Sequence, residues 1–237
     1  MTIRLFVDTP LQAGAEFTLP PAAARHAQVR RVQPGQMLCL FDGGGAEWPA
    51  EVLKMGRSDV GVRVGAPVFV DRELDAAVTL ALGMPANDRM DTLVEKATEL
   101  GVARLQPLVC ERSVLRLDGE RALRKQVHWR GVAVAACEQS GRTRVPVVEP
   151  VRSFADWLAS GRIDGQRLLL SPQPGARPLR EAGAGPLCAL SGPEGGLSAA
   201  EESAALAAGF VATGLGPRVL RAETAPLAVL AWVALRG

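Results

Sequence analysis

The stretch LSGPEGGLSAAEESAALAAGFVATGLGPRVLRAET, residues 190–224, decides how this chain folds. It holds two Gly/Pro-rich loops, GPEGG (192–196) and LGPRVLRAET (215–224), and each loop directly follows a short apolar run. Apolar runs that stop at Gly-Pro are typical of buried parallel strands that end in a loop. Between the loops, Ser198 and Glu201 have the spacing of a capping box and predict the start of a helix. We therefore expect two loops at adjacent strand ends, forming a crevice in which backbone N–H groups bind a ligand.

The residues inside the first loop limit what that ligand can be. The phosphate-loop pattern G-x-x-x-x-G-K-[ST] fails because Leu197 and Ser198 follow the glycines without a lysine. Pro193 and Glu194 interrupt the dinucleotide pattern G-x-G-x-x-G, which argues against a Rossmann-type oxidoreductase. A carboxylate in the loop opposes a pyrophosphate but tolerates a cationic ligand. A tight turn with no ligand remains the structural alternative.

Composition limits the class of protein and the kinds of site. The chain has 237 residues and is 48% apolar, enough for a substantial core in one large or two small domains. No stretch approaches the ~20 uncharged apolar residues of a membrane span, and the N-terminus lacks the apolar core of a signal peptide. We therefore expect a cytoplasmic protein. Four scattered cysteines and two histidines predict neither a disulfide framework nor a metal site.

Two regions of the chain differ in their predicted secondary structure. Residues 1–70 are β-rich, with a short helix at 21–31, and predict a small barrel of about five strands. The expected strands are 4–7, 36–41, 47–55 and 60–70. The polar segment 70–75 predicts the domain boundary. From residue 76 strands and helices alternate, which predicts an α/β domain with a parallel sheet.

Hydrophobic periodicity places the elements of the second region. A helix is expected over 88–101, capped by Asp88, and a longer one over 118–140, with Leu123 and Val127 among its apolar positions. The remaining expected elements are strands at 76–84, 104–110, 145–148 and 167–171, a short helix at 154–160 and a last helix at 224–235. The last helix is apolar on more than one side, which is typical of burial across a subunit interface.

The distribution of charge is more informative than the net charge of +2. Residues 104–144 contain nine Arg or Lys against four Asp or Glu. A local positive excess favours RNA phosphates, although basic runs are also common on solvated faces. At the end of the long helix, Gln139 has the chemistry to bond a base edge. Arg112, Arg142 and Arg144 could hold phosphates, with helix capping and plain surface charge as the alternative.

The motifs of the chain, taken together, resemble the RsmE family of the SPOUT class of RNA methyltransferases. Two loop motifs carry the resemblance, SGPEGGLSAAE (191–201) and LGPRVLRAETAPLAVLAW (215–232). Further matching blocks follow the expected order: RHAQVRRVQPG (25–35), FDGGGAEW (41–48), AEV (50–52), EKATELGV (95–102), ERSV (111–114) and ACEQSGRTRVP (136–146). The resemblance covers nearly the whole chain, and two independent loop motifs make it specific.

The resemblance implies a fold and an activity. The implied fold is α/β, with a C-terminal SPOUT-type parallel sheet and deep trefoil knot at 76–237 and an N-terminal PUA-like RNA-binding β-barrel at 1–70. The implied activity is transfer of a methyl group from S-adenosylmethionine (SAM) to N3 of one uridine, uracil 1498, of 16S ribosomal RNA, without a metal. The implied partners are that RNA in the small ribosomal subunit and a second copy of the chain in a homodimer. A non-catalytic RNA-binding or ribosome-assembly protein is the alternative.

The resemblance also implies site residues, with SAM lying among three loops. Its expected contacts are Leu170, Ser191, Gly192, Gly196, Leu215, Gly216 and Leu220. For catalysis we hypothesise that Glu194 favours the sulfonium or accepts a proton, and that Arg221 stabilises negative charge on the uracil carbonyls. An ion pair between Glu194 and Arg221 that braces the loops is the equal alternative. Arg25, Arg30 and Arg31 are expected to contact RNA, unless they are ordinary surface arginines.

Overall fold

The computed structural model describes residues 2–57, 59–86 and 88–236, and the chain divides into two compact units. Unit 1 comprises Met1–Glu73 and Val134–Val145, and unit 2 comprises Leu74–Ala133 and Pro146–Gly237. The sequence predicts one boundary near residues 70–75, with everything after it in a single domain. In the structure the chain returns to unit 1 at the end of a long helix.

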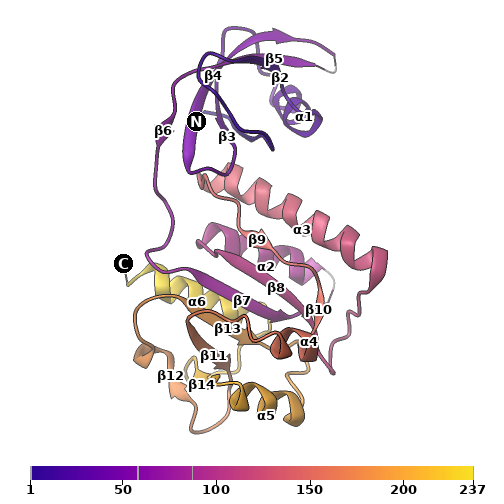
Figure 1. Ribbon diagram of the computed structural model, residues 1–237, viewed down its shortest axis with the longest axis vertical. Helices are drawn as coiled ribbons and strands as arrows, with labels where there is room; N and C mark the ends of the chain where they lie inside the picture. Colours follow the sequence, from indigo (N-terminus) through magenta and orange to yellow (C-terminus); the bar gives the residue numbers. More distant parts are fainter. Residues whose placement is uncertain (1, 58, 87, 237) are drawn as a thin grey trace. The chain divides into compact units, whose positions relative to one another are not determined.

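Unit 1 is built on a six-stranded sheet with one helix (Figure 1). Its elements are β1 (Arg4–Phe6), β2 (Glu16–Thr18), α1 (Pro21–Val29), β3 (Met37–Phe41), β4 (Ala46–Met55), β5 (Val60–Val64) and β6 (Val68–Phe69). The strand order is β1-β3-β4-β5-β2, with β6 paired to β4. Strands β1 and β3 are parallel and the other pairs are antiparallel. The short β2 has no counterpart among the expected strands, because three residues are too few to show an alternating pattern.

One expected strand divides in two. Residues 60–70 form β5 and β6, separated by three residues that include Gly65 and Pro67. The N–H of Gly65 donates to the carbonyl of Pro49 at 2.7 Å, where the pairing of β5 with β4 ends, and Pro67 has no N–H to continue a ladder. Strand β6 then pairs with Ala46 and Glu47 at the N-terminal end of β4. The expectation of one continuous strand is therefore wrong at its centre.

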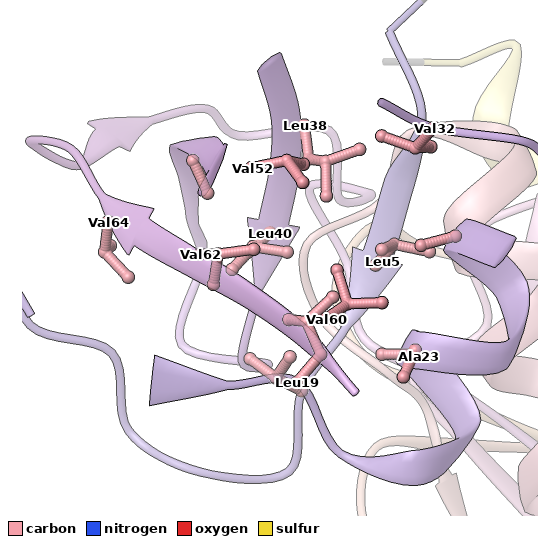
Figure 2. Close-up of a cluster of buried hydrophobic side chains, with 14 residues drawn as sticks. Leu5, Leu19, Ala23, Val32, Leu38, Leu40, Val52, Val60, Val62 and Val64 are labelled. Carbon is pink, nitrogen blue, oxygen red and sulfur yellow. The ribbon is translucent and has the colours of Figure 1, made fainter. Parts of the chain in front are cut away.

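The core of unit 1 gathers side chains from the sheet and from α1 (Figure 2). Val60, Val62 and Val64 alternate along β5, so the pleat turns all three to the same face, and each is at most 1% exposed. Helix α1 contributes only alanines to its buried face. Small side chains let a helix lie close to a sheet, so the core is made of branched side chains on one side and a near-flat helix face on the other.

The last two turns of helix α3 (Gly119–Ser140) and the loop after it belong to unit 1, where polar contacts hold them. Glu138 accepts a hydrogen bond from the N–H of Phe6 at 3.0 Å and pairs with the ring of His26 at 3.0 Å. The carbonyl of Gly141 accepts hydrogen bonds from two arginines of unit 1, at 2.8 and 2.9 Å. These contacts explain why the residues at the end of a helix that begins in unit 2 pack with the N-terminal sheet.

Unit 2 is an α/β unit with an eight-stranded parallel sheet (Figure 1). Its further elements are β7 (Val78–Gly83), α2 (Asp88–Glu99), β8 (Arg104–Val109), β9 (Val147–Val148), β10 (Arg152–Ser153), α4 (Phe154–Ala159), β11 (Gln166–Leu170), β12 (Arg177–Pro178), the short helix η1 (Leu179–Glu181), β13 (Leu187–Ser191), α5 (Ala199–Ala207), β14 (Val211–Gly214) and α6 (Thr224–Ala234). The strand order is β10-β8-β7-β13-β11-β14-β12, with β9 paired to β8. The predicted α/β class with a parallel sheet is confirmed.

Both faces of the sheet in unit 2 are covered. Ala81 belongs to a cluster that includes side chains of α4 and α5, whereas its neighbours Leu80 and Leu82 point to the opposite face and are also buried. Helix α6 packs against α2 and against β13. A parallel strand buried on both faces has a near-continuous apolar sequence, which is why β7 could be predicted.

The helices of unit 2 differ from expectation in two details. Asp88 is the first residue of α2 rather than the cap before it, and the preceding position lies outside the described residues. On α3, Leu123 and Val127 are 60% and 73% exposed instead of buried. Trp129 is fully buried and its indole N–H donates to Asp91 of α2 at 3.0 Å, which fixes the face of α3 that packs inward. Among the helices that the structure describes, none has the length and apolar character to cross a membrane.

Candidate active site

A cavity of about 600 Å³ opens in unit 2 at the carboxyl ends of β11, β13 and β14. Three loops line it, within residues 169–172, 191–197 and 215–222. The three strands are neighbours in the sheet and run parallel, so their carboxyl ends meet at one edge. Ligands of open α/β sheets bind in such a crevice. The two loops that the sequence singles out therefore do lie side by side.

The cavity brings together all nine residues that were expected to bind the cofactor or take part in catalysis. They are Leu170, Ser191, Gly192, Glu194, Gly196, Leu215, Gly216, Leu220 and Arg221. Their position agrees with one shared site, while the role of each stays a prediction. Three charged residues of the lining were not predicted from the sequence: Arg89, Glu202 and Arg218. Arg89 lies in the first turn of α2, the helix that follows β7. It could have been predicted, because the carboxyl end of β7 lies at the same edge of the sheet.

The first loop, residues 192–196, is packed too closely for side chains at two glycines. A Cβ at Gly83 would lie 2.5 Å from both the nitrogen and Cδ of Pro193, and a Cβ at Gly192 would lie 2.8 Å from the nitrogen of Leu197. Gly196 has a φ of +70°, which L-residues rarely adopt. Helix α5 begins directly after this loop, and its predicted capping box is confirmed. The loop is thus fixed at both ends.

Glu194 has a different partner from the expected one. Its Oε1 accepts a hydrogen bond from the N–H of Ala86 at 2.9 Å and pairs with Nη1 of Arg89 at 3.2 Å. Among the described residues no ion pair joins Glu194 to Arg221, so the alternative in which these two brace the loops is wrong. A pair this exposed adds at most about 1 kcal/mol. The pair helps to fix the position of the first loop, because it ties that loop to the segment between β7 and α2.

Arg221 stands at the junction of the second loop and helix α6. Its side chain is exposed and lines the cavity. Its carbonyl accepts hydrogen bonds from the N–H groups of Thr224 and Ala225, at 2.9 and 3.1 Å, which begins the helix. Within the described part of the chain its guanidinium makes no ion pair. Arg221 is therefore a positive charge at the cavity that is available to a ligand.

The residues expected to contact RNA fall mostly in unit 1. That unit contains Arg25, Arg30, Arg31, Gln139, Arg142 and Arg144, while Arg112 lies in unit 2. Arg25, Arg30, Arg31, Gln139 and Arg144 are exposed. Arg144 packs its guanidinium across Gly45, where an added Cβ would lie 2.9 Å from Nη2. The chain's return to unit 1 thus groups the basic segment after α3 with the arginines around α1.

Arg142 differs from the other arginines in its surroundings. It is 3% exposed, and its guanidinium pairs with the carboxylate of Glu73 through Nε at 3.1 Å and through Nη2. A bidentate pair of this kind is directional, and removing one partner would leave a buried charge. The geometry favours a structural role for Arg142 over contact with RNA.

The thiols near the candidate site are not nucleophiles at neutral pH. Burial raises the pKa of Cys188 in β13 to about 12. Burial, with a smaller contribution from the charge of Glu201, also raises the pKa of Cys110 to about 12. A thiol must ionise to react, so both stay protonated. In the part of the chain that the structure describes, no group of three or more His, Cys, Asp or Glu could hold a metal ion.

Comparison with known proteins identifies the family. A family model described as an RNA methyltransferase domain matches residues 72–234, and one described as an RNA methyltransferase PUA domain matches residues 19–64. The ribosomal RNA small subunit methyltransferase E of Bacillus subtilis is 31% identical over 96% of this chain and 94% of its own. The chain belongs to the ribosomal RNA small subunit methyltransferase E family. The relative of that name from Mycobacterium bovis is 33% identical over 95% of this chain and 88% of its own.

A solved structure of this family extends the agreement to three dimensions. The ribosomal RNA small subunit methyltransferase E from Neisseria gonorrhoeae, bound to S-adenosyl methionine, matches with a TM-score of 0.90 and 33% identity. The match covers 98% of this chain and 96% of that one. The predicted membership of the RsmE family is confirmed, as is an N-terminal PUA-like region.

Proposed function

We propose that this protein transfers the methyl group of SAM to N3 of uracil 1498 in 16S ribosomal RNA. The observation that carries the proposal is the cavity at the carboxyl ends of β11, β13 and β14, lined by the two Gly/Pro-rich loops and by Arg221. The SAM-bound structure from Neisseria gonorrhoeae supports the cofactor, and the names of the relatives support ribosomal RNA of the small subunit as the substrate. The choice of nucleotide and of N3 rests on the family resemblance of the sequence.

The cavity suits an adenosine-containing cation. Its volume of about 600 Å³ falls in the range of about 300–1,000 Å³ that is usual for small-molecule sites. Glycines at 192, 196 and 216 let the backbone approach a ligand closely, and Leu220 is placed to cover a flat apolar face. The carboxylate of Glu194 at the rim complements a positive charge. When bound, SAM supplies the methyl group on a positively charged sulfur.

The chemical problem for the protein residues is the proton on N3 of a neutral uracil. A bond forms between N3 and the methyl carbon as the methyl–sulfur bond breaks, its electron pair stays on sulfur, and the N3 proton leaves. Arg221, as an exposed cation at the cavity, would stabilise the negative charge that grows on the uracil carbonyls. Glu194, held by Ala86 and Arg89, would favour the cofactor's charge or accept the proton. The loops would fix the distance and direction of attack.

The RNA surface that we propose lies mainly on unit 1. It consists of Arg25, Arg30, Arg31, Gln139 and Arg144, with Arg112 of unit 2 as a further contact. Exposed arginines bind phosphates, and an exposed amide can bond a base edge. On this proposal residues 1–70 are the PUA-like RNA-binding domain and 76–237 the methyltransferase domain, working in the cytoplasm.

We also propose that the chain is knotted and dimeric. Strand β14 lies between β11 and β12, so the connection from β11 to β13 reaches the far side of β14 before α6 packs on β13. This order supports the trefoil knot that the resemblance implies. On α6, Val229 and Leu230 are fully buried, whereas Leu227, Trp232 and Val233 are half-buried. Leu235, directly after the helix, is 87% exposed. The apolar residues left at the surface of that helix support a homodimer.

Two experiments test the proposed function. Calorimetry with the purified protein should show SAM binding, whereas a non-catalytic RNA-binding protein would show none. Mass mapping of 16S ribosomal RNA from a deletion strain should show loss of one methyl group at uracil 1498, restored by the wild-type gene. Retention of that methyl group in the deletion strain would refute the proposed activity even if SAM binds.

A further inference from the structure

Arg112 lies across the first loop of the cavity and holds it by its carbonyls. Its Nη1 donates to the carbonyl of Gly195 at 3.1 Å and to the carbonyl of Leu197 at 3.2 Å. The side chain also fits closely, because a Cβ added at Gly195 would lie 3.2 Å from Cβ of Arg112. One guanidinium nitrogen therefore binds the carbonyls of the residues before and after Gly196.

The segment that carries Arg112 is itself fixed in place. The N–H of Cys110 donates to Oγ of Ser113 at 3.0 Å, and the N–H of Ser113 returns to the carbonyl of Cys110 at 3.1 Å. Glu201 in the first turn of α5 then joins this turn to the loop. One of its oxygens accepts the N–H of Glu111 at 2.8 Å and the other accepts the N–H of Ser198 at 2.9 Å. Arg112 is thus anchored on a rigid turn that contacts the same helix start.

With these contacts, most peptide groups between the first loop and α5 have partners. The carbonyls of Gly195 and Leu197 bind Arg112, the N–H of Gly196 binds the carbonyl of Pro193 at 2.8 Å, and the N–H of Ser198 binds Glu201. Of these four groups, the two carbonyls are the ones that depend on a side chain from outside the loop and its helix. Without Arg112 they would turn to water and the residue between them, a glycine, would regain its conformational freedom.

We propose that Arg112 is a positioning residue that sets the affinity for SAM by holding the first loop in its binding conformation. This inference rests on the proposed function and deepens it. A loop that is ordered before the ligand arrives loses little conformational freedom on binding, so ordering the loop in advance raises the affinity for SAM. Nothing in this role requires contact between Arg112 and RNA, although the residue is exposed. The role is therefore separable from the phosphate contact proposed for the same side chain.

The test compares Arg112→Ala with a matched control, Arg121→Ala, which removes the same charge from an exposed position of α3. Calorimetry should show that Arg112→Ala binds SAM about tenfold more weakly than the wild type, or about 1.4 kcal/mol, while Arg121→Ala is unchanged. In steady-state assays the KM for SAM should rise and kcat at saturating SAM should stay near the wild-type value. Arg112→Lys keeps a donor within reach of the carbonyls and should recover part of the affinity.

Two further measurements separate this inference from the alternatives. Hydrogen exchange on the ligand-free protein should be faster for the amides of 192–198 in Arg112→Ala than in the wild type, with the rest of unit 2 unaltered. Filter binding to a 16S ribosomal RNA fragment reports separately on the phosphate contact proposed for Arg112, so any loss of RNA affinity in Arg112→Ala should accompany the loss of SAM affinity and not replace it. Equal SAM affinities of wild type and Arg112→Ala, or a loss of RNA affinity alone, would overturn the inference. Absence of SAM binding by the wild type would instead refute the proposed function, and the cofactor role of Arg112 with it.

Discussion

Replacing Gly83 with alanine should weaken SAM binding, because the new methyl group would push on the first loop. Gly83 ends β7, and its position for a Cβ lies 2.5 Å from two atoms of Pro193 and 2.8 Å from the carbonyl carbon of Gly192. Ordinary contact begins at 3.4 Å, so the atoms must separate by 3.4 − 2.5 = 0.9 Å. The obstacles are backbone and a proline ring, which cannot move aside as a flexible side chain would.

The loop is the part that should move. Strand β7 is hydrogen-bonded on both edges, to β8 and to β13, whereas the first loop borders the cavity. Overpacking of this kind costs about 1–3 kcal/mol. If the displaced loop carries most of that cost in the bound state, SAM affinity falls by about tenfold to a hundredfold, since about 1.4 kcal/mol corresponds to tenfold.

Calorimetry with SAM and thermal unfolding of the same samples would measure the effect of Gly83→Ala. The matched control is Gly131→Ala in α3, where an added Cβ meets no atom within 4 Å. Alanine is the better helix former by about 1 kcal/mol, so this control should keep its SAM affinity and be equally or more stable. Wild-type affinity together with a wild-type melting temperature in Gly83→Ala would show that the close approach of β7 does not shape the site.

Four other predictions concern the site and its surroundings. Arg221→Ala should abolish methyl transfer with a near-normal SAM Kd, and an equal loss of both would show that Arg221 acts through cofactor binding and not on the uracil. Ser198→Ala should lower the free energy of unfolding in urea by about 1 kcal/mol by removing the cap of α5, and an unchanged midpoint would contradict it. Ellman's reagent at pH 8 should react first with the partly exposed Cys39, and simultaneous reaction of all four thiols would be inconsistent with the burial. The slow thiols, whose pKa burial raises to about 12, are Cys110, Cys137 and Cys188. Because their ordinary pKa of 9.0 is lower, unfolding releases protons between about pH 9 and 12, so the free energy of unfolding should fall as the pH rises through that window.

The elements that could be predicted from the sequence are those set by short-range patterns. Strands β7 and β13 are continuous apolar runs buried on both faces, and the capping box at Ser198 fixes the start of α5 from two residues three apart. The two Gly/Pro-rich loops follow such strands directly. Placing them at one crevice needed only the rule that parallel strands share a carboxyl edge.

Contacts between distant residues could not be predicted in the same way. Arg142 and Glu73 are 69 positions apart, and nothing in their local sequence distinguishes a buried pair from two solvated charges. For the same reason the sequence predicts one basic surface in the segment after α3, although one of its arginines is structural. Leu123 and Val127 show the limit for helices, because Trp129 and its bond to Asp91 decide which face of α3 is buried.

The first loop depends both on a short-range motif and on contacts between distant residues. Its glycines and its glutamate are visible as a motif, but Glu194, Gly195 and Glu201 are held by partners 108, 83 and 90 residues away. Those partners come from the connections after β7 and β8. The order β8-β7-β13 makes both connections neighbours of the loop after β13, so strand order alone would have predicted which segments support it. A site at the edge of a parallel sheet therefore depends on two features of the sequence. One is the local motif that contacts the ligand, and the other is the strand order, which decides which segments support that motif.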